Sequence, residues 1–218
     1  MSAFVGELEA FKAERLAPIV GAGRMSLEGG ASGDAKAMLQ VALANEISVS
    51  ELAAIWMPTT TELDVKLAFA RQAGDEANHF VLVADRLRAL GFDPDTFDAL
   101  GPPAKSPLFK YLASLSTTVE RIAAGLFTLE SIAYGVNENF MAFCAARGDD
   151  ETVRIYREYI QPDERAHQQL GQRLLDKYAT TPELQQLARD TVANVLDIAA
   201  ATRAKAAEKL GNACFPGC

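Results

Sequence analysis

Both histidines of this 218-residue chain lie in the same short motif. Residues 75–79 read D-E-A-N-H and residues 163–167 read D-E-R-A-H, so each histidine follows a glutamate by three residues. Residues three apart share one face of an α-helix, where a carboxylate and an imidazole can bind the same metal ion. The repeated motif therefore favours folds in which two helices bring these faces together.

The rest of the sequence is typical of an all-helical protein. Alanine, leucine, glutamate and arginine are frequent, and no stretch shows the sustained alternation of a β-strand. Hydrophobic residues make up 49% and charged residues 23%, which is a globular composition rather than a disordered one. The net charge of −8 provides no basic surface for a phosphate backbone, so we expect no nucleic-acid partner.

The sequence also predicts where the protein resides. No segment approaches about 18 uninterrupted apolar residues, so we expect no membrane span. The first residues are acidic and lack the basic and apolar regions of a signal peptide. Three cysteines do not make a disulfide framework in a chain of this length. Together these observations predict a cytoplasmic protein.

Capping and helix-breaking residues divide the chain into predicted helices. A glycine-rich loop is expected at 21–33, with Ser32 or Asp34 capping the helix that follows it. Thr60 or Thr61 is the expected cap of the third helix, and Gly91 ends that helix. The predicted helices cover 3–20, 34–57, 61–90, 108–146 (with a kink allowed), 151–178 and 182–210, followed by a non-helical tail at 211–218.

A proline-rich segment separates two predicted pairs of helices. Residues 91–107 contain four prolines and two glycines and cannot be helical throughout. A segment of this length spans at most about 55–60 Å when extended, which is enough to cross a whole helical bundle. We therefore expect a single domain over 1–218, with a core bundle at 34–178 and accessory helices at both ends.

Two further glutamates lie on otherwise apolar helix faces. Glu46 is in the middle of the second predicted helix and Glu130 is in the fourth. Burying an ionised carboxylate without a partner is very costly, and a metal ion is one way to offset that cost. Alternatively, both glutamates are partly exposed at helix edges, and each histidine is a core side chain that hydrogen-bonds to a carboxylate.

The register of the helix pairs supports the metal hypothesis. In an antiparallel hairpin, two residues at the same height are equidistant from the turn. The midpoint between Glu46 and Glu76 is position 61, close to the break at Pro58. The midpoint between Glu130 and Glu164 is position 147, at the predicted Arg147–Gly148 turn. Each pair is therefore expected to meet at one level.

Four carboxylates and two histidines on four helices resemble the ferritin-like di-iron carboxylate superfamily. The resemblance covers about residues 34–178. It implies a ferritin-like four-helix bundle with one long crossover and two bound iron ions, with manganese or a mixed Mn/Fe pair as alternatives. Glu76 and Glu164 take the place of the bridging carboxylates. The implied metal ligands are Glu46, Glu76, His79, Glu130, Glu164 and His167.

Three other residues near these motifs are candidate site residues. A metal-bound histidine usually donates its other N–H to a carboxylate, and Asp75 and Asp163 are candidates for that role. The alternative is that both are solvated charges on the helix surface. Tyr134 lies one turn past Glu130 and is a candidate catalytic residue, as a hydrogen-bond donor or a radical site. The alternative is an ordinary core tyrosine.

The three cysteines give weaker signals. Cys214 and Cys218 form C-x₃-C, which suggests either a mobile dithiol or regulatory disulfide, or an ordinary disordered tail. Cys144 is predicted to lie in the core, about 21 Å along its helix from Glu130 and too far away to be a ligand. No second C-x-x-C pair is present, so a rubredoxin-type iron centre is not expected.

The resemblance implies an enzyme that activates O₂ to oxidise or hydroxylate a small organic substrate, apolar or carrier-bound. Small residues near the ligands favour a pocket for this substrate, although they also permit close helix packing. An external reductase or ferredoxin would supply electrons, and we expect a homodimer. The alternative is a ferroxidase or a rubrerythrin-like protein that detoxifies peroxide or handles iron. A metal-binding structural protein without turnover is the third hypothesis.

Overall fold

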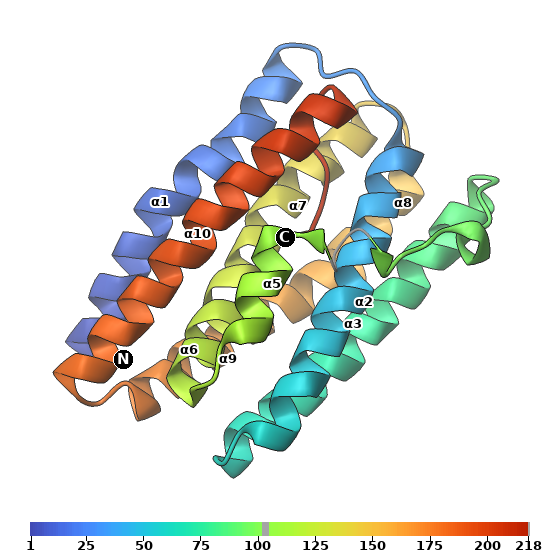
Figure 1. Ribbon diagram of the computed structural model, residues 1–218. Helices are drawn as coiled ribbons and strands as arrows, with labels where there is room; N and C mark the ends of the chain where they lie inside the picture. The colour runs from blue at the N-terminus through green and yellow to red at the C-terminus, as the bar shows by residue number, and fades with distance from the viewer. Residues whose placement is uncertain (102–104, 218) are drawn as a thin grey trace.

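The computed structural model describes residues 1–101 and 105–217, and within them the chain is all-helical with no strand (Figure 1). This confirms the predicted all-α class. The elements in chain order are α1 (Ala3–Glu28), α2 (Ala35–Thr59), α3 (Leu63–Ala89), the 3₁₀ turn η1 (Pro94–Thr96), α5 (Pro107–Ser114), α6 (Thr118–Ile122), the π-helix η2 (Ala123–Leu129), α7 (Glu130–Ala145), α8 (Asp150–Ile155), the π-helix η3 (Tyr156–Ile160), α9 (Gln161–Tyr178) and α10 (Pro182–Leu210).

The helices form two packed pairs with a covering layer. α2 and α3 form a close antiparallel hairpin, and α7 packs against α9. α3 contacts α9 and so joins the two pairs. α1 and α10 lie side by side and pack on α7 and η2 respectively, as Figure 1 shows. The terminal helices are therefore part of one packed unit with the predicted core.

Two hydrophobic clusters fill the interior on either side of a polar layer. Trp56, Phe69 and Phe127 belong to one cluster, and Leu43 and Phe140 belong to the other. On α2, on α3 and along η3 and α9 the boundary between the clusters falls at the predicted ligands. Burial of these side chains supplies most of the free energy that holds the helices together.

α2 alone is long and apolar enough to cross a membrane, judged by length and composition over the described residues. Most of its apolar stretch is buried inside the protein. The core helix of a globular protein passes the same test, and α2 also carries Glu46 in its buried face. α2 therefore has the surroundings of a core helix.

The predicted loop at 21–33 is wrong, because α1 continues to Glu28. Glycines in this stretch permit close packing instead of ending the helix. A Cβ atom on Gly23 would lie 2.5 Å from the Asn139 side-chain nitrogen, so α1 approaches α7 closely and a larger residue there would displace the Asn139 side chain. The actual loop is short, and Asp34 caps α2 by accepting a hydrogen bond from the Lys36 N–H.

The predicted turn between the second and third helices also needs correction. α2 includes Pro58 in its last turn and ends at Thr59. Thr60 does not cap α3, because its hydroxyl donates to the Trp56 carbonyl at 2.9 Å and its position closes α2. Glu62 is the residue that precedes α3. The predicted helix start at Thr181 and Pro182 is confirmed.

The predicted fourth helix, 108–146, is not one kinked helix. α5 ends at Ser114, and Thr117 starts α6 with a capping box that involves Glu120. The chain then passes through the π-helix η2 into α7. Reciprocal hydrogen bonds at the cap stabilise a new helix start, which explains the break. Of the crossover prolines, Pro102 and Pro103 lie outside the described residues.

The tail after α10 is neither mobile nor disordered over 211–217. Cys214 is a buried free thiol, and Phe215 is 2% exposed. The Arg203 guanidinium donates to the carbonyls of Phe215 and Gly217 at 2.7 and 2.6 Å. These bonds hold the tail inside the bundle, so the expectation of a loose tail is corrected. Cys218 lies outside the described residues, and Cys144 is buried as predicted.

Candidate metal centre

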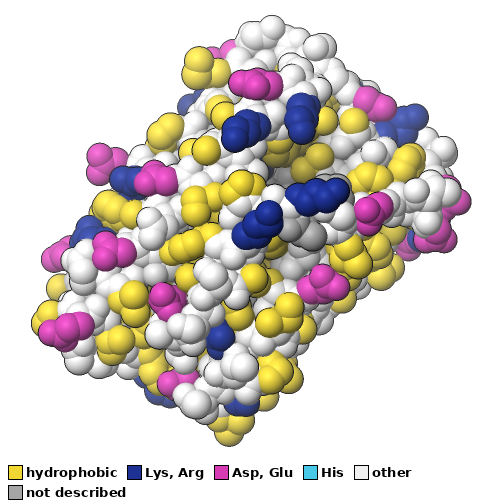
Figure 2. Space-filling view, viewed as in Figure 1, with side chains coloured by type: hydrophobic (Ala, Val, Ile, Leu, Met, Phe, Trp, Pro, Cys, Tyr) yellow, Lys and Arg dark blue, Asp and Glu magenta, His cyan; other side chains and the backbone are white. Residues whose placement is uncertain are grey.

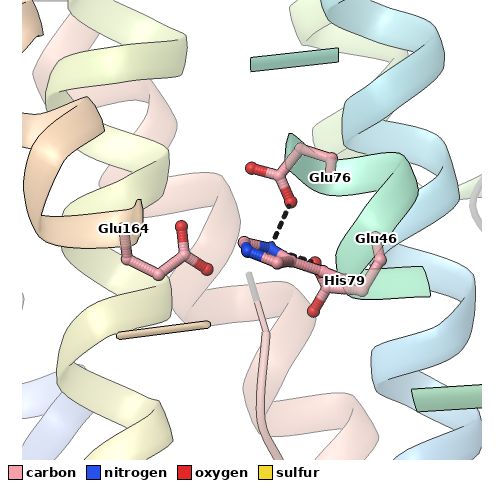
Figure 3. Close-up of side chains that lie close together, drawn as sticks. All are labelled: Glu46, Glu76, His79 and Glu164. Atoms are coloured by element: carbon pink, nitrogen blue, oxygen red, sulfur yellow. Dashed lines mark hydrogen bonds and ion pairs between the residues drawn. The ribbon is translucent and has the colours of Figure 1, made fainter. Parts of the chain in front are cut away.

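The six residues predicted as metal ligands lie together in the polar layer between the two hydrophobic clusters. Each is at most 4% exposed. Figure 3 shows four of them pointing toward one another from three different helices. α2 carries Glu46, α3 carries Glu76 and His79, α7 begins with Glu130, and α9 carries Glu164 and His167.

The six residues form two overlapping groups, each of which could hold a metal ion. One group contains Glu46, Glu76, His79 and Glu164, and the other contains Glu76, Glu130, Glu164 and His167. Within each group, one ligand atom from every residue lies within 4.8 Å of the others. Glu76 and Glu164 belong to both groups. Shared carboxylates between two four-residue groups are the arrangement that a pair of neighbouring metal ions requires.

His79 faces the cluster with one ring nitrogen and an aspartate with the other. Its Nδ1 lies 3.3 Å from Glu76 Oε2 and 3.6 Å from Glu46 Oε2. Its Nε2 lies 3.3 Å from Oδ2 of Asp163, on the opposite motif. A neutral imidazole that donates from Nε2 to Asp163 presents the lone pair of Nδ1 to the cluster, as a metal ligand must.

His167 has the same arrangement, with the partners exchanged. Its Nδ1 lies 3.5 Å from Glu130 Oε1 and 3.6 Å from Glu76 Oε1. Its Nε2 lies 3.0 Å from Oδ2 of Asp75, on α3. Each D-E-x-x-H motif therefore supplies the aspartate that contacts the histidine of the other motif. These crossed pairs join α3 to α9.

The electrostatics of the cluster favour retained protons when no cation is present. Burial and the neighbouring Glu130 charge raise the pKa of Glu76 and of Glu164 well above the ordinary glutamate value. Burial disfavours the charged imidazole of His167, yet Glu130, Glu76 and Asp75 raise its pKa to about 9. Burial also opposes ionisation of Glu130, but the adjacent His167 lowers its pKa.

Three atoms of the cluster are buried without a hydrogen-bond partner in the part of the chain that the structure describes. They are Oε1 of Glu76, Oε2 of Glu164 and Nδ1 of His167. Unsatisfied buried polar atoms are rare and costly in folded proteins. Once deprotonated, all three atoms present a lone pair that would coordinate a cation. The residues present therefore fit two bound metal ions.

π-helices precede the ligands on both α7 and α9. The Glu130 N–H donates five residues back, to Gly125, and the Gln161 N–H donates five residues back, to Tyr156. Such wide turns are frequent at functional sites because they redirect the side chains that follow. If each wide turn were replaced by regular α-helix, the side chains of Glu130 and Glu164 would be rotated by about 100° about the helix axis. The widened turns thus set the direction of two ligands.

Lys12 of α1 anchors the wide turn before Glu130. Its Nζ donates to the Phe127 carbonyl at 3.2 Å and to the Ser131 hydroxyl at 2.6 Å. The side chain is 2% exposed, and burial lowers the pKa of the ammonium group although Glu9 opposes that shift. A buried cation of this kind is retained only with good partners, and here they include a carbonyl of the π-helix.

Two glutamines near the cluster were missed by the sequence analysis. The Gln72 amide donates to the Glu130 carboxylate, and Gln168 donates to the Glu130 backbone carbonyl at 2.9 Å. Gln72 is only 1% exposed and lies one turn before Glu76. A polar side chain at that spacing from a ligand shares its helix face. That spacing is the signal that would have identified Gln72.

Charges of the cluster act on Tyr156, whereas the Tyr134 hydroxyl points away from the cluster. The structure directs the Tyr134 hydroxyl toward the surface, where it accepts a hydrogen bond from Arg165 at 2.7 Å. Tyr156 is fully buried, and its pKa is raised by burial and then by the charge of Glu46. Its position depends on η3, which no sequence pattern indicated.

Comparison with known proteins gives a family without an assigned function. The sequence pattern of the family described as "Protein of unknown function (DUF455)" matches residues 26–206. No curated protein and no solved structure matches the chain. The matched range includes all six residues of the cluster and both aspartates.

Proposed function

This chain belongs to the DUF455 family of proteins of unknown function, and we propose that it is a ferritin-like di-iron protein. We propose further that it activates O₂ to oxidise a small organic substrate. The observation that carries this proposal is the pair of overlapping groups that share Glu76 and Glu164. Manganese or a mixed Mn/Fe pair is an alternative occupant, because carboxylate-rich sites with imidazole suit either metal.

The order of the helices supports a ferritin-like topology. One glutamate and one Glu-x-x-His motif occur on the α2–α3 pair, and the same set recurs on the α7–α9 pair. A long crossover between Leu90 and Ser106 separates the two pairs. This distribution over four helices, with one long connection, is the pattern of ferritin-like di-metal proteins.

The surroundings of the cluster favour oxidation of an organic substrate over a ferroxidase function, in which iron ions would have to enter and leave. When bound, two ferrous ions would supply electrons for the reduction of O₂. Hydrophobic clusters lie on both sides of the ligands, each of which is at most 4% exposed. A ferroxidase needs a polar path for hydrated cations, and the apolar layers disfavour such a path along the bundle. Asp75 and Asp163 orient the histidines, and an external reductase or ferredoxin would return the electrons.

Metal reconstitution under anaerobic conditions tests the proposal. We expect about two iron ions per chain in the wild-type protein and loss of metal in Glu76→Ala. Glu51→Ala is a matched control, because Glu51 is an exposed glutamate on α2. It should leave the metal content unchanged. A wild-type protein that binds no metal, or a Glu76→Ala variant that binds it normally, would contradict the assignment.

Mixing the di-ferrous protein with O₂ distinguishes oxygenase from ferroxidase. An oxidised species that decays faster when an organic compound is added supports the proposed function. Continuous Fe(II) oxidation with growth of a ferric mineral would replace it by the ferroxidase alternative. Both outcomes are readable by stopped-flow absorbance and product analysis.

A further inference from the structure

An apolar cleft lies between α2, α5 and α10, apart from the metal cluster. Its volume is about 360 Å³, and its lining includes Val41, Phe97, Phe109 and Phe215. This size is within the range of small-molecule sites. Figure 2 shows a hollow on this face of the protein, with hydrophobic side chains on its floor and Lys and Arg side chains around its rim.

A buried amide without a hydrogen-bond partner lines the cleft. Asn45 is 9% exposed, and its Nδ2 has no partner among residues 1–101 and 105–217. A buried donor left unpaired costs free energy that a ligand oxygen would recover. Asn45 directly precedes Glu46 of the metal cluster. The cleft therefore reaches the helix turn that carries one of the proposed ligands.

Lysines concentrate where the cleft opens to solvent. A second hollow of about 670 Å³ shares Ser106, Thr202 and Ala206 with the cleft. It is lined by Lys105, Lys205 and Lys209, none of which has an ion-pair partner within the described residues. The one acidic residue in this lining, Asp197, is already paired with Arg15. The opening is therefore positively charged.

We propose that the cleft binds an amphipathic organic anion. The apolar body would pack against the phenyl rings and the anionic group would lie at the lysines. A ligand that also carries an oxygen atom along its body would gain a hydrogen bond from Asn45, whereas an unsubstituted alkyl chain tests the rings and the lysines alone. The identification of this molecule as the substrate rests on the proposed function, because oxidation requires the metal cluster. The binding site itself does not depend on metal.

Calorimetric titration of the metal-free, full-length protein with decanoate tests this site. We expect one decanoate per chain, bound more tightly than decan-1-ol, which lacks the charge. Lys205→Met/Lys209→Met should weaken decanoate binding by about three- to ten-fold and leave decan-1-ol binding unchanged. Arg173→Met, which removes an exposed cation on α9 outside the cleft lining, is the matched control and should have no effect.

A second variant tests the cleft through its shape. Ala206 is half-buried and lines both hollows, so Ala206→Trp should block decanoate and decan-1-ol alike. The far-UV circular dichroism and the metal content of both cleft variants should equal those of the wild type. Absence of decanoate binding, or binding that neither cleft variant weakens, would overturn the proposal.

The two proposals fail in different ways. A protein that loads two metal ions but does not bind decanoate contradicts only the cleft. A protein that binds decanoate but no metal contradicts the di-iron function and leaves the cleft as a binding site.

Discussion

The two halves of the metal cluster use the same motif on different backbones. In the α2–α3 half, His79 lies on a regular helix of 27 residues that packs mainly on its hairpin partner. In the α7–α9 half, both helices follow π-helices, and α1 and α10 cover the outside. An i, i+3 spacing therefore suffices for a ligand pair on the regular helix α3, whereas in the other half tertiary contacts also set the direction of the ligands.

The α2–α3 half also exposes more large apolar side chains to solvent than α7 does. Leu63 and Leu67 on α3 are 70% and 62% exposed, whereas no large apolar side chain of α7 is among the exposed ones in the described chain. In the α7–α9 half, α1 thus covers α7 and α10 covers η2, all of whose residues are buried. Enclosure keeps water from η2, whose hydrogen bonds would otherwise be open to competition from solvent.

The largest expected effect comes from ligands that the two halves share. Glu76→Ala or Glu164→Ala removes a carboxylate from both groups, so we expect loss of nearly all bound metal. Glu46→Ala or Glu130→Ala removes a ligand from one group only and should leave about one metal ion per chain. Metal analysis by mass spectrometry measures the difference. Equal losses in all four variants would show that the halves are not distinct.

Acidic pH should weaken metal binding by a large factor. His167 has a pKa of about 9 without metal, so at pH 7 it carries a proton that a cation must displace. Each displaced proton makes the apparent affinity rise about tenfold per pH unit below the pKa. Competition with a chelator from pH 6.5 to 9 measures this slope. An affinity that does not change with pH would contradict the assigned protonation.

The crossed aspartates test the independence of the halves. Asp163→Asn should weaken the group containing His79, and Asp75→Asn the group containing His167, each by about 10- to 100-fold in metal affinity. Asp163 contacts His79 across 84 residues of sequence, so its effect should appear on the opposite half. Combining Asp163→Asn with Glu46→Ala, which already disables that half, should add little. Additive losses would argue against the crossed arrangement.

The smallest expected effects are changes in the free energy of unfolding, which should differ between two helical glycines, one in each half. A Cβ atom on Gly171 of α9 would lie 2.8 Å from the backbone of η2, so Gly171→Ala should lower the free energy of unfolding by about 1–3 kcal/mol. At Gly74 of α3, no described atom outside its own stretch of helix lies within 4 Å of that position, so Gly74→Ala should be neutral or stabilising by about 0.5–1 kcal/mol. Urea denaturation of the metal-free protein measures both.

The polar layer could be predicted from the sequence because its signals are local. Helical spacing places Glu76 with His79 and Glu164 with His167, and burial cost identifies Glu46 on an apolar face. The structure brings these residues together with Glu130. Whether they bind metal stays a prediction that the experiments above address.

The features that were missed depend on long-range packing. α1 continues through Gly23, which packs closely against Asn139 of α7, whereas glycine alone is a loop signal in the sequence. The tail is ordered because Arg203 of α10 binds its carbonyls. Tyr156 reaches the cluster environment through η3. None of these contacts has a periodic pattern that a sequence can reveal.

The crossed histidine–aspartate pairs also fix the alignment of the two hairpins. If α3 slid past α9 by one turn, about 5.4 Å, His79 would lose Asp163 and His167 would lose Asp75 in the same step. No intermediate alignment keeps one pair and loses the other, because the two pairs run in opposite senses between the same helices. One alignment of α3 and α9 therefore satisfies both histidines at once, and it is the alignment that brings the cluster together.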